Sequence, residues 1–307
     1  MTLFFELVTR VAPLYGFILL GFIVGRFSPL RKEFIARLLI YCITPLVVLE
    51  VVWRTSLTNG AWSLPFLFFI LATVLCACGF FLAQRIWKDE TKNILAFSAG
   101  AGNTGYFGLP VVSSLLGDDV LAFAILAVLG VILYENSVGY FITARGHFSV
   151  KKSLRKVLCL PALFAFVGGA LLHTFAVPLP TLLHDAGFYV RGAYTVLGMM
   201  LIGFSIVGVR MSTIDLKFLS VTFFMKFLAW PFLAGGVIVA DTAWFHIYSP
   251  EIHQVIFLLS IVPLAANTVV FATELNAKSE QMAFAVLSST LFALLYIPFL
   301  VTLVHLV

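Results

Sequence analysis

The stretch AGAGNTGYFGLPVV, residues 99–112, lies inside a segment that is otherwise apolar enough to cross a membrane, and it decides how this chain must fold. It contains four glycines, an asparagine, a threonine and a proline. In a helix interior each glycine costs about 1 kcal/mol relative to alanine, and a proline costs about 3 kcal/mol. Pro110 cannot donate to the carbonyl of Tyr106, and the glycines let the chain leave helical geometry. We therefore expect the helix to be interrupted here.

An interrupted helix is costly in lipid, because the freed backbone groups must be buried in protein or face a watery cavity. We expect a half-helix to begin near Pro110, with free N–H groups and the positive end of its dipole able to bind a carboxylate or phosphate. Asn103 and Thr104 add directional donors and acceptors, and Gly105 follows them directly. The alternative interpretation is that the glycines and the proline only permit close packing or a kink.

The composition is that of a polytopic membrane protein. Of the 307 residues 62% are hydrophobic and 11% are charged, with a mean hydropathy of +1.08, whereas soluble domains carry about 25% charge. The net charge of +5 comes from basic residues in short loops beside apolar segments, so it indicates membrane orientation and no nucleic-acid partner. The four cysteines lie in or at the edge of apolar segments, so we expect neither a disulfide nor a metal site.

A helix needs about 20 apolar residues to cross a bilayer core. Ten such segments can be placed, at 7–26, 34–53, 64–85, 93–116, 120–144, 157–177, 187–209, 217–240, 252–274 and 281–304. The loops on one side then carry Arg26, Arg31, Lys32, Arg37, Arg85, Lys88, Lys92, Arg145, Lys151, Lys152, Arg155, Lys156, Arg210, Lys217 and Lys278, and the other side carries Arg10, Arg54 and Arg191. This asymmetry puts both termini on the non-cytoplasmic side.

A basic linker, residues 147–156, divides the chain into 1–146 and 157–307, with five expected spans in each part. Halves with an odd number of spans can be homologous only if they are inserted in opposite senses, as in many secondary transporters. The fourth span of each half contains a related string, AGNTGYFG at 101–108 and AANTVVFA at 265–272, although short strings can also agree by chance. In the second string Pro263 frees the carbonyl of Leu259, and Asn267 and Thr268 follow. Two broken helices would then meet near the membrane midplane, where transporters of this plan bind substrate.

These residues also carry a resemblance to a known family. NTGYFGLP, residues 103–110, resembles the Asn-Thr-x-x-x-Gly-x-Pro signature of the auxin efflux carrier family, which includes plant PIN-type carriers and bacterial dicarboxylate permeases. PLAANTVVFATELNA, residues 263–277, resembles the corresponding segment of the ninth span, although Thr268 stands where plant carriers have a second proline. The likeness extends over essentially the whole chain, without the long central loop of many plant members.

The resemblance implies a fold similar to that of the sodium/bile acid symporters. Spans 1, 2, 6 and 7 would form a scaffold, spans 3–5 and 8–10 a transport domain, and the broken fourth and ninth spans would cross. It further implies elevator-like alternating access, a homodimer and, since the chain is short like the bacterial members, a bacterial inner membrane. Asn103 would bind a substrate carboxylate, and Pro110 and Pro263 would be the helix-breaking positions.

Two ionisable residues are expected at membrane depth, where charge is expensive and indicates function. Lys226 lies about 12 Å into the eighth span, with Pro231 after it to free the carbonyl of Phe227. It would attract an anionic substrate or replace a coupling ion, or else snorkel or pair with a carboxylate. Glu135 lies about 15 Å from the end of the fifth span and would either carry a proton or be a fixed partner of Lys226.

The sequence therefore predicts a secondary carrier for a small organic anion, such as a mono- or dicarboxylate or an auxin-like carboxylate. Coupling to H⁺, coupling to Na⁺ and uniport all stay open, and no cofactor is expected. The alternatives are an intramembrane enzyme or an ion channel that uses the same polar residues. The residues expected to bind substrate are Asn103, Thr104, Gly105, Pro110, Pro263, Asn267, Thr268 and Lys226, with Glu135 as the coupling candidate.

Overall fold

The computed structural model describes residues 2–54, 61–178, 180–207 and 214–304. These residues form helices joined by short connections, with no strand among them, as expected for an all-α membrane protein. Elements labelled η are single 3-10 or π turns. Up to the basic linker the elements are α1 (Thr2–Phe27), α2 (Lys32–Leu38), η1 (Leu39–Ile43), α3 (Thr44–Arg54), η2 (Ala61–Ser63), α4 (Leu64–Ile86), α5 (Thr91–Gly100), η3 (Thr104–Gly108), α6 (Leu109–Leu116), η4 (Asp118–Val120), α7 (Leu121–Tyr134), η5 (Glu135–Gly139) and α8 (Tyr140–Ala144).

From the linker onward the chain is again helical. Most of the basic linker, residues 147–156, lies in a helix, Val150–Leu158, that was not predicted from the sequence. The elements are α9 (Val150–Leu158), α10 (Pro161–Thr174), α11 (Thr181–Ile206), α12 (Leu216–Phe224), η7 (Met225–Ala229), α13 (Trp230–Ala240), η8 (Asp241–Phe245), α14 (Pro250–Ser260), α15 (Asn267–Glu274) and α16 (Ser279–Leu303).

Six helical runs among the described residues are long and apolar enough to cross a membrane. They are Lys32–Arg54, Ala61–Ile86, Leu121–Ala144, Asp185–Ile206, Leu216–Phe245 and Ser279–Leu303. Each overlaps a span expected from the sequence. The pair α9 and α10, bent by 46°, makes a seventh if it is counted as one span, and a shorter apolar helix covers Ala12–Phe27. The protein is therefore a polytopic helical membrane protein, whereas the total of ten spans stays a prediction.

The expected spans at 93–116 and 252–274 are both interrupted, as predicted from the glycines and Pro110 in the first and from Pro263 in the second. Helix α5 ends at Gly100 and a helical turn resumes at Thr104, while α14 ends at Ser260 and α15 begins at Asn267. An α-helix begins next to Pro110, as expected, but a wide helical turn from Thr104 to Gly108 precedes it without a gap. Pro110 lies in the first turn of α6, where a missing N–H costs little, and Leu109 N–H closes the preceding wide turn on the carbonyl of Thr104.

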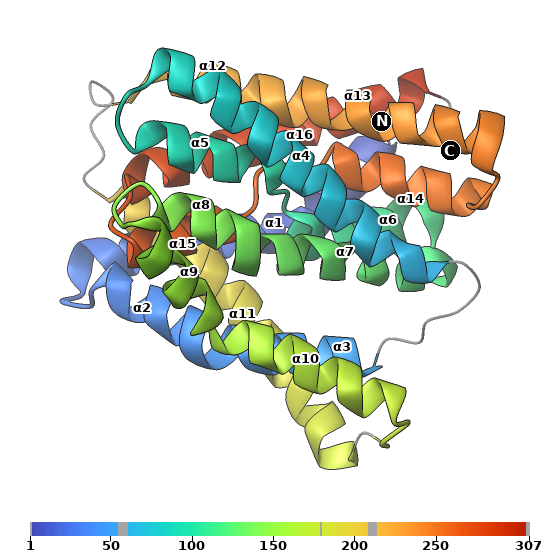
Figure 1. The fold of residues 1–307 in the computed structure, drawn as a ribbon, viewed down its shortest axis with the longest axis horizontal. Coiled ribbons are helices and arrows are strands. Elements are labelled where there is room, and N and C mark those ends of the chain that lie inside the picture. The colour runs from blue at the N-terminus through green and yellow to red at the C-terminus, as the bar shows by residue number, and fades with distance from the viewer. Residues whose placement is uncertain (1, 55–60, 179, 208–213, 305–307) are drawn as a thin grey trace.

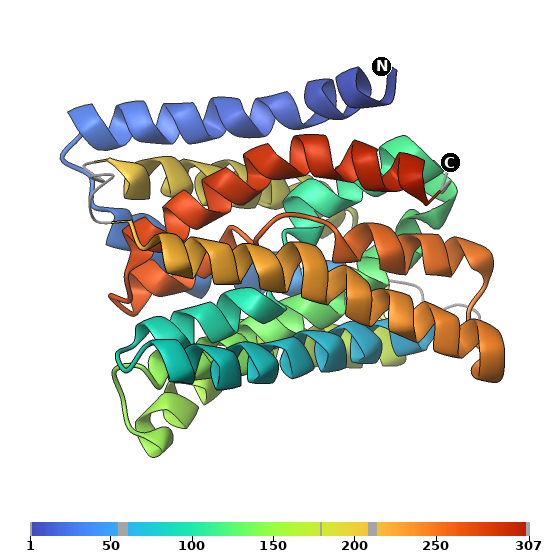
Figure 2. The ribbon, with the colours of Figure 1, turned by 90° about the horizontal axis from the view of Figure 1, so that it is seen from above.

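The helices pack in two sets that include partners far apart in the sequence. Helix α1 lies along α11, α3 packs on α10, and α4 packs on α5 and α7. Figure 2 shows α1 at one edge of the molecule, with α11 and α16 next to it. The chain ends marked N and C lie toward the same end of the bundle, away from α9 (Figure 1). The side chain of Arg10 and the whole of Arg210 lie outside the described part of the chain.

Glycines set the close approach of α1 to α11. A Cβ atom at Gly21 of α1 would overlap the backbone of Met200, and one at Gly203 of α11 would overlap the backbone of Ile18. Small residues at such contacts let membrane helices approach closely enough to gain dispersion energy along their backbones. The α1–α11 pair is therefore a tightly fitted unit.

Candidate functional site

The first helix break is shaped by glycines that leave room for neighbouring side chains. After α5 the backbone becomes extended at Ala101 and turns at Asn103. A Cβ atom at Gly102 would lie 2.7 Å from Nζ of Lys226. A Cβ atom at Gly108 would lie 2.8 Å from a methyl carbon of Leu259 in α14. The break therefore packs closely against the eighth and ninth expected spans.

The two breaks are joined by a backbone hydrogen bond. The N–H of Asn103 donates to the carbonyl of Pro263 over 2.8 Å. The carbonyl of Asn103 accepts from the N–H of Gly108 at 2.9 Å, and the N–H of Leu264 donates to the hydroxyl of Ser289 at 3.1 Å. These backbone groups at the breaks are thus bonded within the protein, as the bilayer interior requires.

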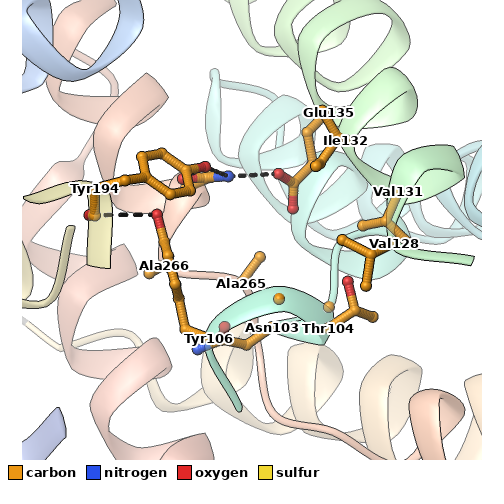
Figure 3. Close-up of a pocket in the computed structure, with 13 residues that line it drawn as sticks. Asn103, Thr104, Tyr106, Val128, Val131, Ile132, Glu135, Tyr194, Ala265 and Ala266 are labelled. Atoms are coloured by element: carbon orange, nitrogen blue, oxygen red, sulfur yellow. Dashed lines mark hydrogen bonds between the residues drawn. The ribbon is translucent and has the colours of Figure 1, made fainter. Parts of the chain in front are cut away.

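A small cavity of about 40 Å³ lies between the two breaks and helices α7 and α11. One water molecule needs about 10–15 Å³ of such space, so the cavity admits a few waters and no organic anion of several heavy atoms in this conformation. Figure 3 shows side chains from four parts of the chain converging on it. Its lining residues are Gly102, Asn103, Thr104, Gly105, Tyr106, Val128, Val131, Ile132, Glu135, Tyr194, Ala265, Ala266 and Asn267.

One wall of the cavity is a connected polar network centred on Asn267. Its amide Nδ2 donates to the Glu135 carboxylate at 2.7 Å. The Tyr194 hydroxyl lies 2.8 Å from Nδ2 and donates to Oδ1 of Asn267 at 3.1 Å. The Tyr106 hydroxyl donates to the Tyr194 carbonyl at 3.4 Å (Figure 3), and the two rings lie 4.8 Å apart. The network links α11 to both breaks and to η5.

The other wall carries unused polar groups. Asn103 and Thr104 are each 4% exposed, and within the described residues neither side chain makes a hydrogen bond. Both line the cavity, across from Glu135 in Figure 3. Because buried polar groups are rarely left unpaired in native proteins, an amide and a hydroxyl without partners indicate a place where water or a ligand binds.

Lys226 is fully buried and lies behind the first break. It is 0% exposed, and among the described residues its ammonium has no hydrogen-bond acceptor. Nζ lies 4.8 Å from the ring centroid of Trp230, in cation–π geometry, and it interacts electrostatically with Glu135. The carbonyl of Phe227, which Pro231 was expected to free, accepts a hydrogen bond from the Tyr296 hydroxyl.

The structure gathers five of the nine predicted site residues around one cavity, namely Asn103, Thr104, Gly105, Glu135 and Asn267. The other four do not line it. Pro110 lies in α6, the carbonyl of Pro263 is bonded to Asn103, and the hydroxyl of Thr268 donates to the Ala265 carbonyl at 2.6 Å. Nζ of Lys226 lies beside Gly102, but Lys226 does not line the cavity.

Sequence reasoning missed Tyr106 and Tyr194 as site residues. Tyr106 stands inside the glycine-rich motif itself, so its place could have been suspected. Tyr194 lies in an ordinary apolar span, and only the packing of α11 brings it to the cavity. Among the described residues, no group of three or more His, Cys, Asp or Glu side chains could hold a metal ion.

The sequence is similar to a transport family model and to proteins that are named transporters. Residues 6–147 match the family described as membrane transport protein. An uncharacterized transporter of Methanothermobacter thermautotrophicus is 22% identical over 289 residues, which cover 92% of this chain and 93% of the relative. An uncharacterized transporter of Methanocaldococcus jannaschii is 24% identical over 201 residues, which cover 62% of this chain and 65% of the relative. Residues 6–147 thus resemble the membrane transport protein family, and the similarity to two proteins that are named transporters supports a transport function for this chain.

Proposed function

We propose that this transporter is a secondary carrier for a small organic anion, which binds between the two helix breaks. The observation that carries the proposal is the pair Asn103 and Thr104, whose buried side chains lack partners and line the cavity. The Asn103 amide and the Thr104 hydroxyl can each donate a hydrogen bond to a carboxylate. The nearby ammonium of Lys226, on the far side of Gly102, supplies the positive charge that makes an anion the preferred ligand.

Glu135 is the proposed coupling residue. Its carboxylate is 2% exposed and forms part of the same cavity wall. A negative charge there would repel an incoming carboxylate. Binding a proton at Glu135 removes that charge, so the arrangement favours proton coupling over sodium coupling.

The mechanism that we propose is elevator-like alternating access. The pairing of α1 with α11 and of α3 with α10 supports a scaffold made of spans 1, 2, 6 and 7, and the packing of α4 on α5 and α7 supports a separate transport domain. Movement of the transport domain would break the hydrogen bond between Tyr194 on the scaffold side and Asn267 on the transport side.

The membrane arrangement is likewise proposed. Two inverted repeats of five spans, with crossing fourth and ninth spans, account for the paired breaks. The position of both chain ends toward one end of the bundle supports placing them together on the non-cytoplasmic side (Figure 1). A bacterial inner membrane and a homodimer follow from the family resemblance, and light scattering of the detergent-solubilised protein would test the dimer.

The proposed function is tested by thermal unfolding of the purified protein with a panel of mono- and dicarboxylates, including indole-3-acetate and malonate. The panel is run at two pH values, with and without sodium. A ligand that binds only the folded state raises the melting temperature. We expect at least one carboxylate to do so, and we expect Asn103→Ala to lose that response while it stays folded and monodisperse.

A matched control tests whether the lost response is specific to the site or follows from removing any buried asparagine. Asn93 is another buried asparagine, in α5, whose amide donates to the carbonyl of Ile142. Asn93→Ala should lower the basal melting temperature and keep the ligand response. A wild-type protein that responds to no carboxylate, or an Asn103→Ala variant that responds fully, would contradict the proposal.

A further inference from the structure

The helix formed by the basic linker has an unusual distribution of side chains. Helix α9 carries Lys151, Lys152, Arg155 and Lys156, and no acidic residue occurs between Arg145 and Leu158. Only Ser153 and Val157 are buried against the rest of the protein. The helix therefore presents both its basic residues and an apolar surface outward.

The charges of α9 are not neutralised within the protein. In the part of the chain that the structure describes, none of its four basic side chains has a carboxylate partner. By contrast, Lys32, Arg37 and Lys278 are each paired with a carboxylate, at 3.7, 3.0 and 2.6 Å. The ammonium groups of Lys152 and Lys156 both lie over the ring of Phe148, at 4.5 and 4.7 Å from its centroid. Four cationic side chains without a carboxylate partner on one short helix favour binding of an external anion.

An apolar stripe runs beside these charges and continues onto the membrane-facing surface. Val150, Leu154 and Leu158 of α9 are 57%, 49% and 59% exposed, and their spacing of four residues places them on one helix face. In α10, the exposed residues Phe164, Val167 and Leu171 form a similar stripe. Because α9 joins α10 through a bend of 46°, the apolar stripe of α9 lies next to a second helix with an exposed apolar stripe.

We infer that α9 is an interfacial helix that binds the headgroups of anionic phospholipids, with Val150, Leu154 and Leu158 directed toward the acyl boundary. Basic residues that flank an apolar face are typical of helices that lie at the surface of anionic membranes. Each Lys or Arg near such a surface strengthens the binding, and salt weakens it. This binding site is separate from the proposed anion site and does not depend on it.

The test is thermal unfolding of the protein in a neutral detergent, with added phosphatidylglycerol or phosphatidylcholine. We expect saturating phosphatidylglycerol to raise the melting temperature by about 5 °C, phosphatidylcholine to have little effect, and 1 M NaCl to suppress the rise. The combined variant Lys151→Gln, Lys152→Gln, Arg155→Gln and Lys156→Gln should lose the response. The matched control changes four basic residues outside α9, as Arg85→Gln, Lys88→Gln, Lys92→Gln and Lys217→Gln, and should retain it.

Several outcomes would overturn the inference. An equal rise with phosphatidylcholine would mean that lipid binding is independent of headgroup charge. An equal loss in the control variant would mean that net charge, and not α9, is responsible. A similar rise with inorganic phosphate would identify a site for soluble anions, and a changed oligomeric state in the α9 variant would identify a second copy of the chain as the occupant. If the fourfold variant does not fold, the double variant Lys151→Gln and Lys152→Gln takes its place, and an undiminished response to phosphatidylglycerol in it would overturn the inference.

Discussion

The backbone N–H of Asn103 donates a 2.8 Å hydrogen bond to the carbonyl of Pro263, and this bond joins two helix breaks that lie 160 residues apart in sequence. Since it uses only backbone atoms, it survives substitution of the Asn103 side chain. The side chain is thereby left free to face the cavity. Substitutions at Asn103 can thus test ligand binding without removing the contact that holds the two breaks together.

Tyr194→Phe should weaken binding of a carboxylate by about fivefold. The hydroxyl of Tyr194 contacts both polar atoms of the Asn267 amide, at 3.1 and 2.8 Å, and removing a neutral hydrogen bond costs about 1 kcal/mol. Without that hydroxyl the amide is free to turn within the cavity wall. Ligand titration of the purified variant, followed by intrinsic fluorescence or calorimetry, measures the change.

Tyr106→Phe is the matched control, because it removes a long hydrogen bond of 3.4 Å from the neighbouring ring. It should change the affinity by less than Tyr194→Phe does. Equal effects of the two substitutions would show that the aromatic pair, and not the contact with Asn267, decides affinity.

Lys226→Met should weaken binding of anions more than binding of neutral analogues. The methionine keeps an unbranched apolar side chain beside Gly102 and Trp230 and removes only the charge. We expect a loss of about tenfold or more for a carboxylate such as indole-3-acetate, equivalent to about 1.4 kcal/mol, and a smaller loss for the corresponding amide. Equal losses for acid and amide would assign Lys226 a purely structural role.

The helix break around Asn103 could be predicted from the sequence, because glycine and proline act on the local backbone wherever they stand. The start of α6 near Pro110 could also be predicted, whereas the wide turn from Thr104 to Gly108 that precedes it could not, because no residue pattern marks a π turn. Tyr194 was missed for a different reason. It reaches the cavity only through the packing of α11, and the pattern of an apolar span does not indicate which of its faces meets a broken helix.

Gly21→Ala should destabilise the contact between α1 and α11. The added Cβ atom would overlap the backbone of Met200, and backbone atoms cannot move aside as the end of a flexible side chain can. Overpacking of this kind costs about 1–3 kcal/mol. The melting temperature of the detergent-solubilised variant should fall accordingly.

Gly16→Ala provides the comparison within the same helix. A Cβ atom at Gly16 meets no other atom within 4 Å, so this variant should keep the wild-type melting temperature or raise it slightly, because alanine is the better helix former. If both variants melt at the same lower temperature, the cause is an altered helix α1 and not its fit against α11.

The pair Asp89–Lys278 should make stability depend on pH at the acidic end. Asp89 lies between α4 and α5, outside the membrane-spanning segments, and its carboxylate is 2.6 Å from Nζ of Lys278. Partial burial alone would raise the pKa of Asp89, but hydrogen bonds from Lys278 and Thr91 outweigh it and lower the pKa below its usual value. A carboxyl group whose pKa is lowered by folding stabilises the protein above its unfolded pKa, near 3.9. That contribution is lost as the pH falls through the folded pKa.

In Asp89→Asn the melting temperature should be lower than in the wild type at pH 6, and the melting temperatures of the two proteins should converge as the pH approaches 3. Because Asp89 is about half exposed, the difference should be small and should shrink in high salt. A difference that stays constant from pH 6 to pH 3 would show that the carboxylate charge does not stabilise this connection.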